Sequence, residues 1–134
     1  MAREIKFRGR HLGKWYYGVV VVRNRDAEVP ILIMQNDNLW LPLDIEENCT
    51  VGQFTGFHDV NGKEIFEGDI LKFTDDGLLC YVDWHKHLRK FYLSFGEKQK
   101  ENDTKSDIFE MMRMGYKFAI VGNIHDNPEL LKRI

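Results

Sequence analysis

Two pairs of neighbouring histidine and aspartate residues are the first candidates for chemistry in this sequence. His58-Asp59 and His125-Asp126 each follow a stretch that is predicted to be a strand. If the two strand ends meet in space, two imidazoles and two carboxylates would offer nitrogen and oxygen ligands that suit zinc, manganese or iron. The alternative is that each aspartate accepts hydrogen bonds from backbone amides of its own turn. We favour the turn role and expect no metal and no cofactor.

A group of carboxylates around residue 65 is the second candidate. Asp59, Glu64, Glu67 and Asp69 would in principle supply a general acid and base or ligands for Mg²⁺. Glu64 and Glu67 are an odd number of residues apart, so on a strand they tend to point to opposite faces. No Ser-His-Asp, Cys-His, phosphate-loop or dinucleotide motif is present. The sequence therefore predicts a protein that is not an enzyme, with a metal-dependent hydrolase as one alternative.

Basic residues beside aromatic residues are the third candidate. The first fourteen residues hold five basic side chains and one acidic side chain, and residues 85–90 form a second basic turn. Small barrels hold single-stranded nucleic acid in basic grooves with aromatic platforms. The net charge of -2 gives the whole chain no attraction to nucleic acid. The residues predicted to bind nucleic acid or a protein partner are Arg8, Arg10, Lys86, Arg89, Lys90 and Trp84.

The elements that position these residues are organised around residues 50–73. Asn61-Gly62 predicts a two-residue type I′ turn between strands at 53–57 and 64–66. Gly68 and Asp69, after Glu67, predict a second reversal, because glycine takes a positive φ cheaply and the aspartate accepts from nearby amides. The motif Asn61, Gly62, Glu67, Gly68 and Asp69 therefore has a structural role.

The remainder of the chain reads as short strands with little helix. A central strand is predicted at 15–22, and Pro30 and Pro42 indicate edge strands, which favour pairing with a second copy of the chain. Residues 96–106 lack any large apolar side chain and are predicted to be a mobile loop. Asp107 is predicted to cap a short helix, and Asn127 with Pro128 to begin a C-terminal one. Further strands are predicted at 4–8, ending at Gly9, and at 29–34, 39–43, 70–73, 79–84, 91–95 and 116–124.

These elements predict a mainly β fold, a single-domain barrel or sandwich of short antiparallel strands with a short C-terminal helix. By analogy, the Gly68-Asp69 turn suggests an SH3-like barrel core. A length of 134 residues fits one domain over 1–134. No apolar run is long enough for a signal peptide or a membrane span, which predicts a cytoplasmic protein that does not bind membranes. Cys49 and Cys80 are far apart in sequence and are expected to be reduced thiols.

Three segments also resemble one protein family. They are REIKFRG near the start, TGFHDVNGKEIFEGDIL in the middle and VGNIHDNPELL near the end. Together they are similar to the YopX family of small proteins of phages and prophages. Residues 9–49 and 74–117 carry no part of this resemblance. It implies a mostly β protein of phage origin and assigns no activity.

We therefore expect a non-enzymatic phage or prophage accessory protein, working in the host cytoplasm, that binds a protein partner or itself. A single-stranded nucleic-acid-binding protein is the alternative. A metal-dependent hydrolase is the second alternative.

Overall fold

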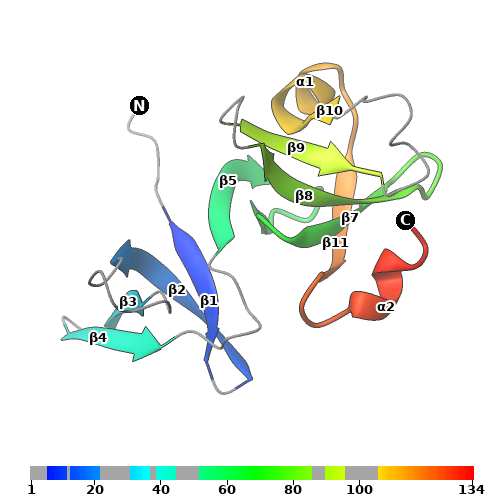
Figure 1. Ribbon diagram of the computed structural model, residues 1–134. Helices are drawn as coiled ribbons and strands as arrows, with labels where there is room; N and C mark the ends of the chain where they lie inside the picture. Colours follow the sequence, from blue (N-terminus) through cyan, green and yellow to red (C-terminus); the bar gives the residue numbers. More distant parts are fainter. Residues whose placement is uncertain are drawn as a thin grey trace. The chain divides into compact units, whose positions relative to one another are not determined.

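The computed structural model describes residues 6–11, 13–21, 31–36, 39–44, 52–85, 90–95 and 106–134. The chain divides into two compact units, Met1–Gly56 and Phe57–Ile134. The first unit contains β1 (Phe7–His11), β2 (Lys14–Val21), β3 (Ile31–Asn36), β4 (Leu39–Asp44) and most of β5 (Gly52–His58), as Figure 1 shows. The second contains β6 (Glu64–Phe66), β7 (Asp69–Phe73), β8 (Leu79–His85), β9 (Lys90–Ser94), β10 (Ser106–Asp107), α1 (Ile108–Arg113), β11 (Phe118–Asn123) and α2 (Pro128–Leu131).

The first sheet is antiparallel and has the strand order β4-β3-β2-β1-β5-β6. Strand β2 pairs with β1 on one side and with β3 on the other, so the prediction of a central strand is confirmed. Pro42 lies in β4, at the edge of the sheet, which is where proline is tolerated in a strand. Pro30 itself is outside the described residues. The strand that follows it, β3, is paired on both sides, so an edge position for this segment is wrong.

Strand β1 continues through Gly9, which lies opposite Tyr16 in the register with β2. The prediction that Gly9 ends this strand is therefore wrong. Glycine has the backbone N–H and C=O groups that hydrogen bonding between strands needs. Pairing with β2 holds Gly9 in an extended conformation. The predicted strand residues at 4 and 5 are outside the described residues.

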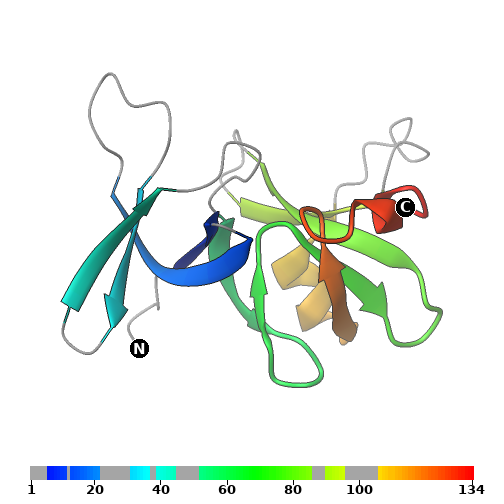
Figure 2. The same ribbon diagram turned by 90° about the horizontal axis from the view of Figure 1, so that it is seen from below.

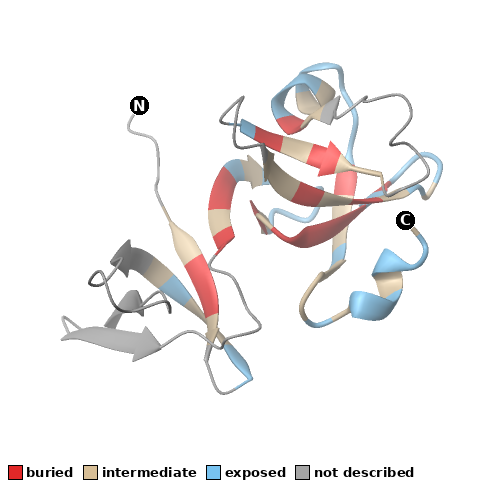
Figure 3. Cartoon of the chain, viewed as in Figure 1, coloured by how far each residue is buried: buried red, intermediate tan, exposed pale blue. Residues whose placement is uncertain are grey.

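The second sheet is also antiparallel and has the order β10-β9-β8-β7-β11. Alternate residues of its strands face one apolar core, as the period of a strand requires, and the buried positions appear in red in Figure 3. Phe73 is central to this core, since its ring contacts those of Phe118 at 4.7 Å and Phe95 at 5.8 Å. The buried members are Ile65, Leu71, Phe73, Cys80, Val82, Phe91, Leu93, Ile108 and Phe118.

Helix α1 covers this core at one end and is visible beside the strands in Figures 1 and 2. Asp107 caps it as predicted, because the aspartate side chain accepts from the Phe109 N–H at 2.8 Å. Ser106 belongs to strand β10 and pairs with Leu93, so the predicted loop ends one residue earlier. The other predicted loop residues, 96–105, lie outside the described residues.

The mainly β prediction, with short antiparallel strands and little helix, is confirmed. Whether residues 1–134 behave as a single domain, and whether the core is SH3-like, stay predictions. Within the described residues, no helix is long and apolar enough to cross a membrane.

Candidate functional site

The hairpin between β5 and β6 differs from the predicted type I′ turn. The Gly62 N–H donates to the Asp59 carbonyl at 3.0 Å, so Val60 and Asn61 occupy the central positions of the turn. Gly62 follows them with φ of +80°. This is the longer hairpin loop in which a four-residue turn is followed by one left-handed glycine. The prediction that Asn61-Gly62 forms the central pair is wrong, because Asp59 competes successfully for the first position of the turn.

Asp59 holds this turn and attaches it to β11. One of its carboxylate oxygens, Oδ1, accepts from the N–H groups of Asn61 and Lys63, both at 2.9 Å. The other, Oδ2, accepts from the Ile120 N–H at 3.0 Å. The Val60 N–H also donates to the Phe118 carbonyl at 2.9 Å. The hairpin turn is therefore hydrogen-bonded along the outer edge of β11, which covers part of an otherwise open sheet edge.

Two opposing effects set the pKa of Asp59. Burial works to raise this pKa, since the side chain is only 7% exposed. Hydrogen bonds from the backbone N–H groups of Ile120, Lys63 and Asn61, together with the Lys63 charge, outweigh burial and lower the pKa from its ordinary value. The carboxylate is thus held ionised as an acceptor of backbone hydrogen bonds, which is a structural task.

The second turn contains Gly68 with φ of +91° and Asp69, which is 2% exposed. The Asp69 Oδ2 accepts from the Phe66 N–H at 2.8 Å. The Gly68 N–H donates to the Val82 carbonyl, and the Gly68 carbonyl accepts from the Ile124 N–H. This turn therefore connects three separate segments of the second unit. Glu67 lies beside it and is partly buried.

The His125-Asp126 corner is organised by Asn123, a residue that the sequence reasoning did not select. The Asn123 Oδ1 accepts from the N–H groups of His125 and Asp126, and its Nδ2 donates to the Asp126 carboxylate. Asn127 makes no side-chain cap of α2, although Pro128 does begin that helix. Its Oδ1 accepts from the Asn123 N–H instead, so the predicted capping role of Asn127 is wrong. The side-chain oxygen of Asn127 therefore bonds to the Asn123 N–H in the corner, and a helix of only four residues is left without this cap.

Gly122 provides a test of this corner. A Cβ at position 122 would overlap the Asn127 side chain, which would lose its bond to the Asn123 N–H. We expect Gly122→Ala to lower the free energy of unfolding by about 1–2 kcal/mol, measured by chemical denaturation. In an Asn127→Ala background the same substitution should have almost no further effect. Full additivity of the two substitutions would contradict this explanation.

The two aspartates of the histidine corners are used in hydrogen bonds of their own turns. In the described part of the chain, no group of three or more His, Cys, Asp or Glu residues lies close enough to hold a metal ion. Both Asp59 oxygens accept backbone hydrogen bonds, and Asp126 accepts from Asn123. His58 lies at the edge of the hairpin turn, and His125 is partly buried in its own turn. The aspartates thus follow the turn alternative.

The predicted basic and aromatic residues occupy several different environments. The Arg8 guanidinium is buried in the first unit and stacks 4.7 Å from the Trp15 ring centre. Arg10 is on the same strand. In the second unit, Trp84 packs against the core and against Phe91, and Lys90 forms an ion pair with Asp107 at 3.1 Å. Lys86 and Arg89 lie outside the described residues. Nucleic-acid binding through these residues stays a prediction.

Two other groups that could react, the Cys80 thiol and the Tyr92 hydroxyl, have raised pKa values. Burial raises the pKa of the Cys80 thiol to about 12, so this thiol is protonated and unreactive at neutral pH. Burial and the hydrogen bond that the Tyr92 hydroxyl donates to the Asp83 carboxylate at 3.0 Å raise the pKa of Tyr92 to about 12.

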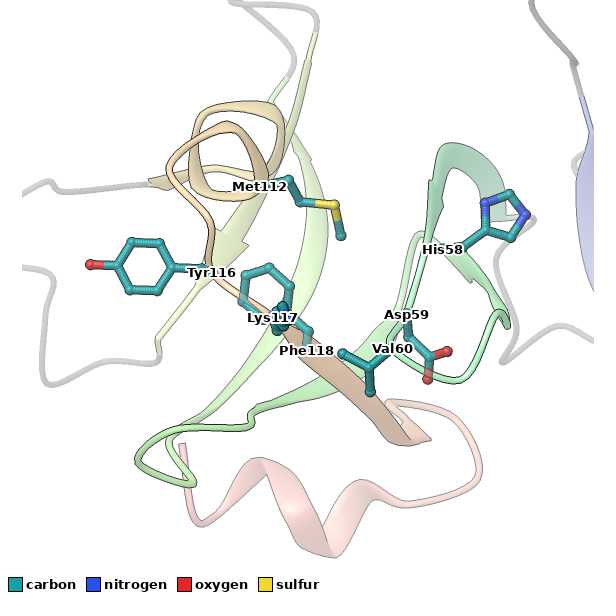
Figure 4. A pocket seen from close by; sticks show the side chains of 7 residues that line it. All are labelled: His58, Asp59, Val60, Met112, Tyr116, Lys117 and Phe118. Carbon is teal, nitrogen blue, oxygen red and sulfur yellow. The ribbon is translucent and has the colours of Figure 1, made fainter.

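The surface feature that sequence reasoning missed is a hollow between helix α1, the hairpin turn and the start of β11. Its volume is about 380 Å³. We call it the α1–hairpin hollow. In Figure 4, Met112 reaches toward the space in front of Phe118 from the helix side, and Val60 reaches toward it from the hairpin side. Its lining residues are His58, Asp59, Val60, Met112, Tyr116, Lys117 and Phe118.

Further apolar side chains surround the hollow. Phe109 lies three residues before Met112 on α1 and therefore on the same side of the helix. Its ring is 6.2 Å from that of Phe57, the residue next to His58. The Tyr116 ring is held edge-on against Phe73 at 5.7 Å. In the sequence, only the apolar residues of the short helical run after Asp107 pointed to this surface. Taken alone, such residues predict a buried core position.

Comparisons with known proteins give a family and a fold. A family model described as YopX protein matches residues 6–132. The crystal structure of protein EF1440 from Enterococcus faecalis is similar, with a TM-score of 0.54 and 24% sequence identity, over 97% of this chain and 99% of that chain. At this identity the likeness shows a shared fold. A search of curated proteins finds no match.

Proposed function

The chain belongs to the YopX family, and we propose that its second unit is a protein-binding module that performs no catalysis. The binding surface is the α1–hairpin hollow with the apolar side chains around it. The partner is another protein or a second copy of the chain. An accessory role in a phage or prophage, which the family resemblance implies, belongs to the same proposal.

One observation carries this proposal: large apolar side chains are exposed around the hollow. Phe109 is 56% exposed, Val60 48% and Tyr116 42%. Exposed apolar side chains near one hollow are a feature of many interaction sites. Aromatic residues and methionine are also the types that protein interfaces favour at their centres, and Met112 adapts its shape to a partner.

The chemistry of the polar groups supports a role without catalysis. Asp59 and Asp69 accept backbone hydrogen bonds at close range, so neither is available as a general base. The Cys80 thiol is buried, with its pKa raised to about 12. Among the described residues, the lining of the hollow mixes the apolar side chains of Val60, Met112 and Phe118 with polar ones.

A pair of equally exposed residues allows a controlled test of the surface. Val60 and Leu78 are both 48% exposed, but only Val60 lines the hollow. We expect Val60→Asp to weaken partner binding at least about tenfold, because it introduces a charge at a desolvated contact, while Leu78→Asp leaves binding within about twofold. The measurement is affinity capture by the full chain from nuclease-treated lysate of its native host, followed by titration of the captured protein. Sedimentation of the chain alone measures self-association in the same variants.

Three results would count against this proposal. The first is that no protein remains bound after nuclease treatment and no self-association is measured. The second is equal loss of binding in the Val60→Asp and Leu78→Asp variants. The third is that material is retained only without nuclease, which would favour nucleic-acid binding instead.

A further inference from the structure

We infer that Asn61 is a latent site of spontaneous deamidation and that Asp59 restrains the reaction. In deamidation, the backbone nitrogen of the next residue displaces ammonia from the asparagine side chain, and water then converts the cyclic product to aspartate or isoaspartate. Asparagine is among the residue types that are least stable chemically. The inference does not depend on the proposed function, because it concerns the chemistry of the hairpin turn itself.

Asn61 has the features of a reactive asparagine. It is the only asparagine in the sequence that is followed by glycine, whose lack of a Cβ leaves the attacking nitrogen unhindered. Both residues are exposed, and a Cβ at Gly62 would meet no described atom within 4 Å beyond its chain neighbours, so water and base reach this peptide. None of the described residues forms a hydrogen bond with the Asn61 side-chain amide, so this amide can rotate toward the Gly62 nitrogen.

The reaction balances without an oxidant or a cofactor. A base in the solvent removes the Gly62 amide proton, the nitrogen bonds to the Asn61 Cγ, and the bond from Cγ to the side-chain nitrogen breaks. That nitrogen takes up a proton and leaves as ammonia, which gives a cyclic imide. Water opens the imide at the side-chain carbonyl to give aspartate, or at the backbone carbonyl to give isoaspartate. The net change is that water is consumed and ammonia is released.

Asp59 opposes the first step of this reaction. The Gly62 N–H donates to the Asp59 carbonyl at 3.0 Å, so the proton that must leave is hydrogen-bonded, and rotation of this peptide breaks the bond. The Asp59 Oδ1 accepts from the N–H groups on either side, those of Asn61 and Lys63, both at 2.9 Å. Its negative charge therefore lies beside the nitrogen that becomes an anion, which is unfavourable. The folded turn thus keeps Asn61 unreactive until the turn opens.

Both products of the reaction weaken the turn. Conversion of Asn61 to aspartate places a second carboxylate in the turn that Asp59 holds, and like charges repel each other. Isoaspartate adds a methylene group to the backbone between the N–H groups of residues 61 and 63, which bond to the same carboxylate oxygen. Deamidated chains should therefore unfold at a lower denaturant concentration than intact chains.

The experiment incubates the full chain at mildly alkaline pH and measures the deamidation of each asparagine by peptide mass spectrometry. In denaturant, we expect Asn61 to react faster than every other asparagine. In the folded wild type, Asn61 should react at least about tenfold more slowly than in denaturant, because the turn must first open. Asp59→Ala should accelerate the reaction in the folded chain about tenfold. Asp76→Ala, the matched control from another hairpin turn, should leave the rate within about twofold.

A second variant covers the stability cost of Asp59→Ala. Asp59→Asn keeps a side-chain oxygen and loses the charge, and it should also react faster than the wild type. Rates of both variants are compared where circular dichroism shows a folded chain. Equal rates for the wild type with and without denaturant would overturn the restraint. The inference also fails if Asn61 is not the fastest asparagine in denaturant, or if the folded Asp59 variants react no faster than Asp76→Ala.

Discussion

Replacement of Asp59 by alanine is expected to lower the free energy of unfolding of the second unit by about 3–5 kcal/mol. Three backbone N–H groups, those of Asn61, Lys63 and Ile120, lose a charged acceptor at once. The loss also removes one of the two hydrogen bonds between the hairpin turn and β11 and leaves the one from the Val60 N–H to the Phe118 carbonyl, so the covered edge of this strand is weakened. Chemical denaturation measures the total effect, and hydrogen exchange of peptides from residues 59–63 and 118–123 locates it.

Asp76 provides the matched control for this substitution. It is also an aspartate in a hairpin turn, but it is exposed, and its Oδ1 accepts only the Leu78 N–H at 2.9 Å. We expect Asp76→Ala to cost at most about 1 kcal/mol. A similar small cost for Asp59→Ala would contradict the role assigned to Asp59.

The same carboxylate predicts how stability depends on pH. The pKa of Asp59 is lower in the folded chain than in the unfolded chain, so the unfolded state binds a proton more readily. The stabilisation is therefore complete above the ordinary pKa of aspartate and is lost as the pH falls through the folded-state pKa. Asp59→Asn should make the free energy of unfolding less dependent on pH in this acid range. The same pH dependence in the variant and the wild type would argue against the role of the Asp59 carboxylate.

Gly68→Ala is expected to destabilise the second unit by about 1–3 kcal/mol. The φ of +91° at Gly68 is a conformation that residues with a Cβ adopt only with strain. If alanine forces the backbone out of this conformation, the hydrogen bonds to Val82 and from Ile124 are lost together. Thermal and chemical denaturation of the variant measure this effect.

Two comparisons test the reason for the Gly68 effect. Gly68→Asn should be milder than Gly68→Ala, because asparagine tolerates positive φ better than alanine does. Gly68→Ala should also accelerate hydrogen exchange at the Ile124 amide, which donates to the Gly68 carbonyl. A fully stable Gly68→Ala variant would show that the turn does not depend on glycine.

Local patterns in the sequence were sufficient for several parts of the fold. The apolar run at 15–22 predicted a central strand covered on both faces, and β2 is central in its sheet, with β1 and β3 as its neighbours. Tyr17 on this strand is nevertheless 46% exposed, so the prediction of two covered faces does not hold there. Gly68 and Asp69 predicted a reversal, and Asp107 predicted a helix start, because each of these depends on contacts within about four residues. The three family segments identified the family, and the family model matches residues 6–132.

Competition between polar groups produced the errors. Asn61-Gly62 is a strong signal for a two-residue turn, but Asp59 accepts two amides of the same loop and sets a longer one. Asn127 precedes a proline in a standard capping pattern, but the Asn127 side-chain oxygen accepts a hydrogen bond from the Asn123 N–H instead. A propensity describes what one residue favours alone. It does not rank two residues that compete for the same N–H group.

By itself, the sequence determined the family, the mainly β character and the positions of the glycines that reverse the chain, since these depend on neighbouring residues. Only the tertiary structure decided that Asp59 bonds to Ile120, 61 residues away, and that residues 58–60, 112 and 116–118 line one hollow. The physical reason is that edge pairing and packing depend on which distant segments share one core, and no local pattern carries that information. The candidate site therefore lies where the hairpin turn, helix α1 and β11 meet.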